Sequence, residues 1–320
     1  MIHLKITEGT TVTLATIGAA PRQVHVFDSD SIDAVNAAIA AKRPLLVRGE
    51  PGTGKTQLAR AAAKALGWAF VPTTIDARSE ATDLLYRLDA VTRLGEAQVT
   101  AVLGKKDENE VRALLAEKNF LHPGPLWWAF DWNSALQQAK LVQAEAPPQT
   151  DSGDPEQGCV LLIDEIDKAD ADLPNGLLEA FGSGRFQPAG LKDAVHRSNR
   201  PLLVVITTNE ERALPDAFLR RCLVLYLKLP EGEGLIEFFV NRGKAHFPKV
   251  HEDILREAAA QVREDRLYWQ EHNLAAPGLA EYLDLVRAVT EQATSVADQK
   301  KLLTRLKNFV LRKHPPEEAA

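Results

Sequence analysis

One eight-residue run constrains the fold more than any other feature of the chain. Gly49-Glu50-Pro51-Gly52-Thr53-Gly54-Lys55-Thr56 fits the pattern of glycine, any four residues, glycine, lysine, then serine or threonine. A short apolar run, Pro44-Leu45-Leu46-Val47, precedes it, and strong helix formers follow from Gln57 to Leu66. Strand, glycine loop and helix in this order are the setting in which the pattern binds phosphate. We therefore predict an α/β fold with a parallel sheet flanked by helices.

The residue types of this phosphate loop suit its chemistry. Glycines let successive amide groups point at phosphate oxygens, and a helix that begins at Lys55 adds its partial positive charge. Lys55 supplies a mobile charge for the outer phosphates, and the Thr56 hydroxyl can bind magnesium. A glycine turn that binds nothing is the disfavoured alternative. The predicted nucleotide-binding residues are Gly49, Glu50, Pro51, Gly52, Thr53, Gly54, Lys55, Thr56 and Gln57.

A second motif lies at the end of a continuous apolar run, Cys159-Val160-Leu161-Leu162-Ile163, which is typical of a strand buried on both faces of a parallel sheet. Asp164 and Glu165 follow at its carboxyl end, where such sheets bind ligands. Asp164 is a candidate magnesium ligand, and Glu165 is placed to orient and deprotonate a water that attacks the terminal phosphate. Two solvent-facing acids are the alternative, which the phosphate loop disfavours.

Two further groups are candidates for the same site. Asn209 ends the apolar run that begins at Pro201, where its amide could reach the attacking water or the terminal phosphate, although asparagine is also a common turn residue. Arg220 and Arg221 precede another apolar run, Leu223 to Leu227. Guanidinium groups at a subunit edge can complete a neighbour's phosphate site, whereas a solvated surface pair is equally compatible with the residues.

The rest of the chain predicts the domain organisation. Short strands or an extended arm are expected in Ile2–Ile6 and Val24–Phe27. A helix is expected over Ile32–Ile39, and a mostly helical insertion at about 75–118, including Glu108 to Lys118. Residues 144–158 are proline-rich and acidic, so they predict a flexible surface loop. Only helical patterns follow Pro230. The predicted domains are a nucleotide-binding domain at 1–229, a small helical lid at 230–314 and a disordered tail at 315–320.

Aromatic residues and cysteines add two smaller expectations. Trp127, Trp128 and Trp132 lie close together, where they could stack bases or grip a peptide, but packing against the following helix is favoured. Cys159 and Cys222 lie beside apolar runs, so buried free thiols are expected rather than a disulfide or a metal site.

Composition limits the partners. The chain has 320 residues, 45% of them hydrophobic, and a formal charge of −6, so no overall charge favours nucleic acid or an anionic membrane. Its first residues show no basic segment followed by an apolar one, and no apolar run approaches membrane-spanning length. A cytoplasmic protein that does not contact membranes is expected.

With these motifs in order, residues 30–310 resemble an AAA+ ATPase, and specifically the MoxR-like branch. The resemblance is carried by the phosphate loop, by the run from Leu161 to Ala169, by Leu177-Leu178-Glu179-Ala180-Phe181, by the Pro123-Gly124-Pro125 turn and by a predicted hairpin at 184–200. It implies ATP and Mg²⁺ as ligands, and rings, often hexameric, that remodel a protein client in a chaperone-like way. Proteins with a von Willebrand factor A domain are common partners of this branch.

The resemblance also implies roles for matching residues. Lys55 and Thr56 become the Walker A lysine and magnesium ligand, Asp164 and Glu165 the Walker B acids, and Asn209 the first sensor. Arg221 corresponds to the arginine that enters the adjacent subunit's site, with Arg220 as its companion or substitute. One departure is that Ala276–Glu281, where relatives carry a second-sensor arginine, contains none, and Arg287 lies two helical turns further along.

These residues lead to three functional hypotheses. The favoured one is ATP hydrolysis at the subunit interfaces of a ring that remodels a protein partner. The missing second-sensor arginine motivates an alternative, an assembly scaffold or switch that hydrolyses ATP slowly. A nucleic-acid motor or loader is less favoured, because only the hairpin region is basic (Lys192, His196, Arg197 and Arg200) in an acidic chain.

Overall fold

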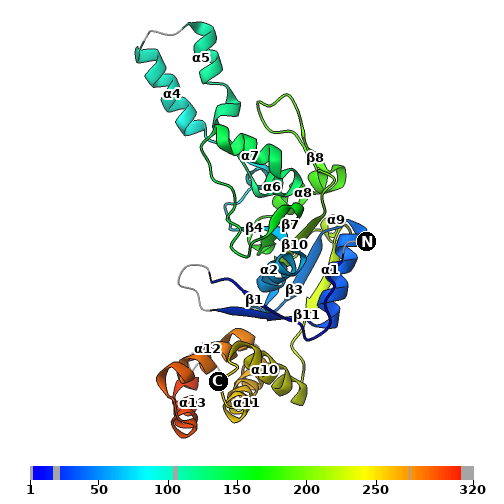
Figure 1. The fold of residues 1–320 in the computed structure, drawn as a ribbon, viewed down its shortest axis with the longest axis vertical. Coiled ribbons are helices and arrows are strands. Elements are labelled where there is room, and N and C mark those ends of the chain that lie inside the picture. Colours follow the sequence, from blue (N-terminus) through cyan, green and yellow to red (C-terminus); the bar gives the residue numbers. More distant parts are fainter. Residues whose placement is uncertain (1–2, 17–21, 104–106, 273, 275, 311–320) are drawn as a thin grey trace. The chain divides into compact units, whose positions relative to one another are not determined.

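The computed structural model describes residues 3–16, 22–103, 107–272, 274 and 276–310, so the tail predicted at 315–320 lies outside the described residues. The chain divides into two compact units (Figure 1). We call them the sheet unit, which comprises Met1–Ile6, Asp30–Val47 and Ala59–Leu225, and the helical unit, which comprises Thr7–Ser29, Arg48–Leu58 and Tyr226–Ala320. The phosphate loop therefore groups with the helical unit.

A five-stranded sheet forms the centre of the sheet unit, in the order β11-β3-β10-β7-β4. Strand β7 pairs in parallel with β10 on one side and with β4 on the other. Val160 of β7 lies opposite Leu203 of β10 and opposite Phe70 of β4. Neighbours on both sides satisfy the backbone of β7, whose apolar residues are buried as predicted. The strands are β3 (Leu45–Gly49), β4 (Trp68–Thr74), β7 (Asp154–Asp164), β10 (Leu202–Thr208) and β11 (Leu223–Leu227).

Helices accompany these strands, and the predicted α/β fold class is confirmed. The helix expected over Ile32–Ile39 is α1, and Gly67 ends α2 with a left-handed φ of 69°. The hairpin predicted at 184–200 is also present, as β8 (Arg185–Phe186) paired antiparallel with β9 (Val195–His196). The helices of this part are α1 (Ser29–Ala41), α2 (Lys55–Leu66), α3 (Ala81–Leu85), α6 (Pro125–Phe130), α7 (Trp132–Leu141), α8 (Asp172–Ser183) and α9 (Asp216–Leu219).

The tryptophan cluster belongs to the core of the sheet unit. Trp127 and Trp128 are only 2% and 5% exposed, and the Trp127 indole N–H donates to Ser134 Oγ at 2.8 Å. Trp128 packs edge-to-face against Trp132, with 5.0 Å between the ring centroids. The packing interpretation is therefore confirmed, because the two buried side chains are covered by protein.

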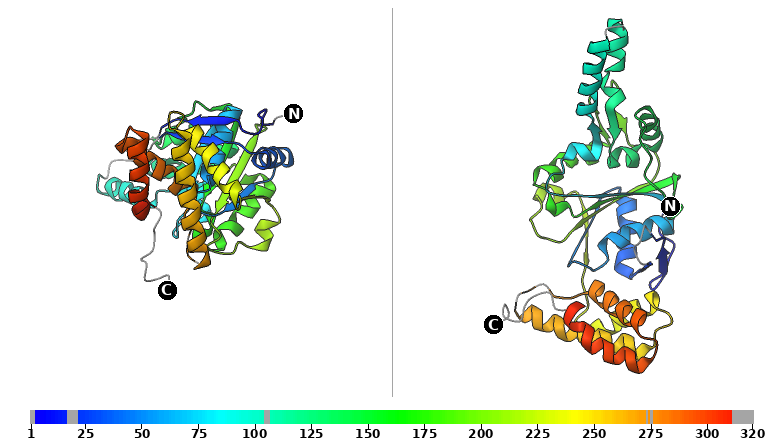
Figure 2. Two further views of the ribbon diagram at one scale, coloured as in Figure 1. Left: turned by 90° about the horizontal axis from the view of Figure 1, so that it is seen from below. Right: turned by 90° about the vertical axis from the view of Figure 1, so that its left-hand side faces the viewer.

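The insertion at 75–118 is mostly helical, as predicted, but its second helix ends at Leu114 rather than Lys118. It contains β5 (Tyr86–Leu88), α4 (Ala90–Leu103), α5 (Glu108–Leu114) and the 3₁₀ helix η1 (Glu117–Phe120), and β5 pairs with β6 (Leu121–Pro123). Figures 1 and 2 show α4 and α5 side by side, extending away from the sheet. None of the described residues of these two helices is buried.

Two irregular segments differ from an expectation of the sequence analysis. Of the two alternatives for Ile2–Ile6, the strand is not formed by the described residues 3–6, where the Leu4 N–H bonds to the Asn36 side chain at 2.7 Å instead of to a neighbouring strand. The 144–158 segment is not a flexible loop throughout, since β7 already begins at Asp154. The Gln149 side chain also bonds to both the N–H and the C=O of Phe70, at 2.7 and 3.1 Å. Polar residues that suggested a mobile loop are thus anchored by partners distant in sequence.

The helical unit packs four helices, as the pattern after Pro230 predicts: α10 (Glu233–His246), α11 (Glu252–Glu271), α12 (Leu279–Gln292) and α13 (Val296–Val310). Phe239 stacks on Tyr282 in its core, with centroids 5.0 Å apart. The same unit contains the antiparallel hairpin of β1 (Thr11–Leu14) and β2 (Gln23–Val26), and β2 confirms the strand expected near Val24. Among the described residues, no helix is long and apolar enough to cross a membrane.

Both cysteines are buried free thiols, as expected. Burial raises the pKa of the Cys222 thiol to about 11, and it raises the pKa of the Cys159 thiol still further. Neither thiol is therefore ionised near neutral pH, which fits packing roles rather than reactivity.

We predict that the Arg60–Asp151 ion pair anchors the segment ahead of β7. Its two side chains are each 8% exposed, and Arg60 Nε lies 2.7 Å from Asp151 Oδ2. Asp151→Asn should lower the free energy of unfolding by about 3 kcal/mol, because it removes the carboxylate charge that faces the buried Arg60 guanidinium and the Lys64 ammonium. Urea unfolding measures the loss. The matched control is Glu108→Gln, which breaks the exposed pair with Arg112 and should cost less than about 0.5 kcal/mol; equal effects of the two variants would contradict the prediction.

Candidate functional site

The phosphate loop connects β3 to α2 in a conformation that depends on glycine. Gly52 and Gly54 adopt φ angles of 75° and 95°, in the region that side chains avoid. A Cβ atom at Gly49 would collide with the carbonyl oxygen of Leu227. Because α2 begins at Lys55, the loop leads directly into a helix N-terminus, which is the arrangement that favours a bound phosphate.

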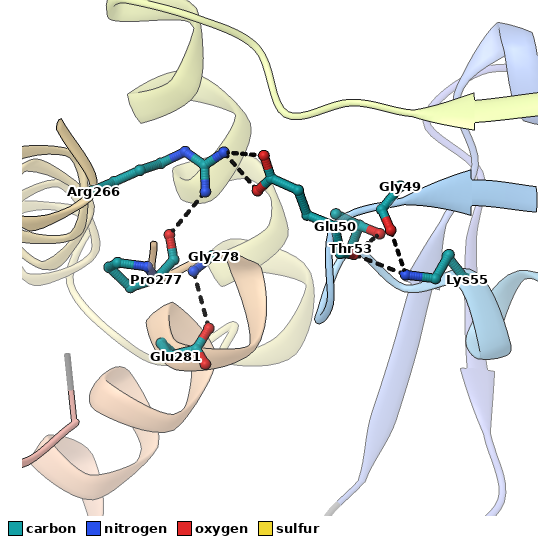
Figure 3. A network of polar contacts seen from close by, with 8 residues as sticks. All are labelled: Gly49, Glu50, Thr53, Lys55, Arg266, Pro277, Gly278 and Glu281. Atoms are coloured by element: carbon teal, nitrogen blue, oxygen red, sulfur yellow. Dashed lines mark hydrogen bonds and ion pairs between the residues drawn. The ribbon is translucent and has the colours of Figure 1, made fainter. Parts of the chain in front are cut away.

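The Lys55 ammonium is held inside this loop. Its Nζ donates to the carbonyl oxygens of Gly49 and Glu50, both at 2.8 Å, and the residue is only 7% exposed (Figure 3). The Thr53 hydroxyl donates to the same Glu50 carbonyl at 2.9 Å. The positive charge of Lys55 therefore lies against the backbone of the loop in this structure.

The Glu50 carboxylate forms an ion pair with Arg266 of α11, a residue that the sequence analysis missed. Arg266 Nη2 lies 2.7 and 2.6 Å from the two carboxylate oxygens, and its Nη1 donates to the Pro277 carbonyl at 3.1 Å (Figure 3). One signal could have revealed it: Arg266 lies at helical spacing between Val262 and Trp269, on the apolar face of α11, where an arginine requires a partner.

The acid pair lies at the carboxyl end of β7, where the neighbouring strand β10 supplies a shared partner. The Thr207 hydroxyl donates to Asp164 Oδ1 at 2.5 Å and accepts the Glu165 N–H at 2.9 Å. Thr207 is completely buried. A single hydroxyl on the adjacent strand thus sets both the carboxylate of Asp164 and the backbone of Glu165.

Glu165 has a left-handed backbone, with φ 59° and ψ 48°, which is unusual for a residue other than glycine. Its carboxylate accepts from the Asn209 side-chain amide at 3.3 Å and lies 3.6 Å from the Lys168 ammonium. Strained backbone that the surroundings enforce is common at functional sites. The contact also confirms that the ends of β7 and β10 bring Asn209 and the acid pair together.

Asp167 positions Asn209, and this second residue was also missed. It is 2% exposed, and its Oδ2 accepts the backbone N–H groups of Asn209 at 3.2 Å and Glu211 at 2.9 Å. The Asp167 side chain, in the turn after β7, therefore holds the backbone of the turn after β10 in position. Burial of an aspartate just after an acid pair has no signal in the sequence alone.

Arg220 and Arg221 are exposed at the end of α9. Arg221 Nη1 donates to the Ala217 carbonyl at 3.1 Å, and the backbone of the pair is fixed by Arg43. The Arg43 guanidinium donates to three successive carbonyls, those of Arg220, Arg221 and Cys222. The two arginine side chains thus project from a fixed backbone.

The candidate residues therefore form two groups that the structure shows separately. Asp164, Glu165 and Asn209 meet in the sheet unit, while the loop residues from Gly49 to Lys55 meet in the helical unit. Thr56 and Asp164 offer hydroxyl and carboxylate oxygens, the donor type that Mg²⁺ prefers. Among the described residues no three or more His, Cys, Asp or Glu side chains cluster as a metal site of their own.

The sequence was compared with models of known protein families. Residues 44–222, more than half of the chain, match the AAA domain of the dynein-related subfamily. The chain belongs to this family. The matched range contains the phosphate loop, the acid pair, Asn209 and both candidate arginines. As an AAA domain, the chain is an ATPase of the P-loop NTP hydrolase type.

Solved structures show more distant likenesses. A point mutant of RuvB from Thermotoga maritima has 15% identity and a TM-score of 0.45, covering 87% of this chain and 68% of that one. The T. maritima RuvB Holliday junction branch migration motor has 15% identity and a TM-score of 0.44, with 87% and 67% covered. A putative ATPase from Cytophaga hutchinsonii has 13% identity and a TM-score of 0.39, with 86% and 78% covered. A search of curated protein sequences found no match.

We predict that Thr207 is required to orient the acid pair. Thr207→Val keeps the side-chain shape but removes the hydroxyl that contacts Asp164 and Glu165, so ATP turnover should fall about 10- to 100-fold. Steady-state phosphate release measures this, and nucleotide affinity should change little. The control is Thr290→Val in α12, where the hydroxyl bonds to carbonyls of its own helix. Unchanged turnover in the Thr207 variant would contradict the role.

Proposed function

We propose that this AAA domain is a subunit of a ring, of the MoxR-like type, that uses ATP hydrolysis to remodel a protein partner. The observation that carries the hydrolysis in this proposal is the contact between Asn209 and Glu165, together with the hydrogen bonds of Thr207 to Asp164 and Glu165. This arrangement supports a role for Glu165 toward a water and for Asp164 toward a metal. A protein with a von Willebrand factor A domain is the proposed class of partner. The domain division at 229/230, between nucleotide-binding domain and lid, is part of the same proposal.

The loop residues would bind the phosphates. Backbone N–H groups of the loop and of the first turn of α2 would surround the phosphate oxygens, and Lys55 would carry the neutralising charge. Support comes from the left-handed glycines and from the Lys55 ammonium, which the loop carbonyls hold in place. Thr56 and Asp164 would hold Mg²⁺, which when bound neutralises charge on the phosphate oxygens.

Glu165 would act as the general base. Its carboxylate is about one-third exposed, 34%, so water can reach it, while Asn209 and Lys168 hold its orientation. In this role it accepts a proton from the water that attacks the terminal phosphate. Asn209 would orient that water or the phosphate through the amide that now contacts Glu165.

Arg221, with Arg220 as companion, would act in the neighbouring subunit. Its exposure and its fixed backbone fit a group that must reach outside its own chain. A guanidinium supplied by a neighbour stabilises transition-state charge and makes hydrolysis depend on assembly. The ring is therefore part of the proposed active site.

One observation supports the slower scaffold alternative. The segment at the start of α12, Ala276–Glu281, contains no arginine, although Ala280 lies against Gly52 of the phosphate loop. Arg287 contacts Asp284 at 2.8 Å and the ring of Phe247, so it offers no substitute. ATP-driven assembly with negligible phosphate release would favour this alternative.

We predict that Glu165→Gln separates binding from hydrolysis. The amide keeps the size of the side chain but accepts no proton, so turnover should fall at least about 100-fold while ATP affinity stays within a few-fold. Phosphate release and nucleotide titration measure the two quantities. Glu179→Gln, which changes an exposed glutamate on α8, is the control. Affinity capture with the Glu165 variant and ATP should also retain the client, and normal turnover would remove Glu165 from its role.

We predict that Arg221 acts across a subunit interface. Arg221→Ala and Glu165→Gln subunits should each be nearly inactive alone. Mixing them should restore part of the activity, because an Arg221→Ala subunit keeps its own base and can receive an arginine from a Glu165→Gln neighbour. Turnover as a function of mixing ratio is the measurement, with gel filtration in ATP to follow assembly. Arg220→Ala tests which arginine serves, and the absence of recovery in every mixture would refute the shared site.

A further inference from the structure

Arg266 joins three segments of the helical unit through one guanidinium. It comes from α11, donates to the carbonyl of Pro277 just before α12, and pairs with the Glu50 carboxylate in the phosphate loop (Figure 3). Its side chain is 8% exposed, whereas that of Glu50 is 54% exposed. The buried partner is thus fixed by the helices, and the more exposed partner belongs to the loop.

The start of α12 also contacts the phosphate loop directly. A Cβ atom built at Gly52 would lie 3.0 Å from the Cβ of Ala280, and one at Gly278 would lie 3.8 Å from the Pro51 carbonyl oxygen. Gly278 donates its N–H to Glu281 Oε2 at 2.9 Å, which closes the first turn of α12. At these two close approaches the residues that face the loop, Gly278 and Ala280, are small and uncharged, whereas Arg266 of α11 brings a charge to the loop.

Glu50 carries this contact onward to Lys55. Its carboxylate faces Arg266, while its carbonyl accepts both the Lys55 ammonium and the Thr53 hydroxyl. Any movement of Glu50 therefore moves an acceptor that holds the phosphate-binding lysine. We propose that Arg266 is a positioning residue for the nucleotide site, which couples the order of α11 and the start of α12 to phosphate binding through the Glu50–Arg266 pair.

Other arginines on the same helix show why Arg266 is distinctive. Arg263 pairs with Glu233, whose side chain is 83% exposed, and Arg256 pairs with Glu237 and Glu252 on the surface. Those pairs link helical residues to each other rather than to the loop. Because exposed pairs contribute little, Arg263 provides a matched control one helical turn away.

Coupling of this kind is reciprocal. If the pair holds the loop ready for phosphate, a variant that lacks the pair binds nucleotide more weakly. In that variant, bound nucleotide should also protect the amides at the start of α12 from hydrogen exchange less than it does in the unaltered protein. The inference rests on the proposed nucleotide site but not on hydrolysis, so ADP serves as the probe. Affinity for ADP and amide hydrogen exchange over 277–282, with and without ADP, are the measurements.

The experiment compares Arg266→Gln, Glu50→Gln, the double variant and Arg263→Gln. Each single change at the pair should weaken ADP binding about 5- to 30-fold, within the usual range for coupled sites. The double variant should be no weaker than either single variant, because the same interaction is lost, and Arg263→Gln should stay within twofold. ADP affinity within twofold of the unaltered protein, or losses that multiply in the double variant, would overturn the proposal.

Failure of a variant to fold and failure of the proposed function give different results. If Arg266→Gln fails to fold, Glu50→Gln breaks the same pair from its more exposed side and carries the test. If the unaltered protein binds ADP without hydrolysing ATP, the proposed hydrolysis fails while the affinities still test the coupling. If the unaltered protein binds no nucleotide, the proposed function fails. The link between loop and helix is then tested without nucleotide, by comparing hydrogen exchange over 277–282 in Glu50→Gln and in the unaltered protein. Faster exchange in the variant supports the link, and unchanged exchange overturns it.

Discussion

Parallel pairing on both sides of β7 is the constraint on which the rest of the sheet unit depends. With β10 on one side and β4 on the other, Cys159–Ile163 are paired on both sides, and their side chains are apolar on both faces of the sheet. Polar chemistry is therefore displaced to the carboxyl end. There the chain turns sharply at Glu165, in a left-handed conformation that the neighbouring Thr207 holds by a hydrogen bond. The chemistry at the strand end follows from burial along the strand.

Features encoded by neighbouring residues could be predicted from the sequence. The glycine loop, the apolar run that ends in Asp164 and Glu165, and the helical pattern after Pro230 each lie within a short window. The proximity of Asn209 to Glu165 needed one more rule, that parallel strands present their carboxyl ends at the same edge, and the 3.3 Å contact follows from that register. The order of strands in a parallel sheet thus predicts which local motifs come together in one site.

Interactions between distant residues could not be predicted in the same way. From the sequence, Asp151 is predicted to lie in a mobile acidic loop, whereas in the structure its carboxylate pairs with Arg60, 91 positions earlier. Asp167 resembles any other acid after the motif until the backbone of Asn209 is found to need an acceptor. Glu50 and Arg266 are 216 positions apart. In each case one charged group is buried and requires a partner, but periodicity and composition do not say which partner.

The Glu50–Arg266 pair is better explained by position than by stability. Burying a guanidinium carries a desolvation cost that a single carboxylate offsets only in part, so an apolar residue at 266 would hold α11 in place at least as well. An apolar residue would not, however, select the conformation of a loop rich in left-handed glycines, because it offers the Glu50 carboxylate no partner. A charged pair fixes that loop at one point, and it does so next to the carbonyl that holds Lys55. The lack of an arginine at the start of α12 therefore does not leave the loop without a charged contact to these helices, because the contact comes from the preceding helix.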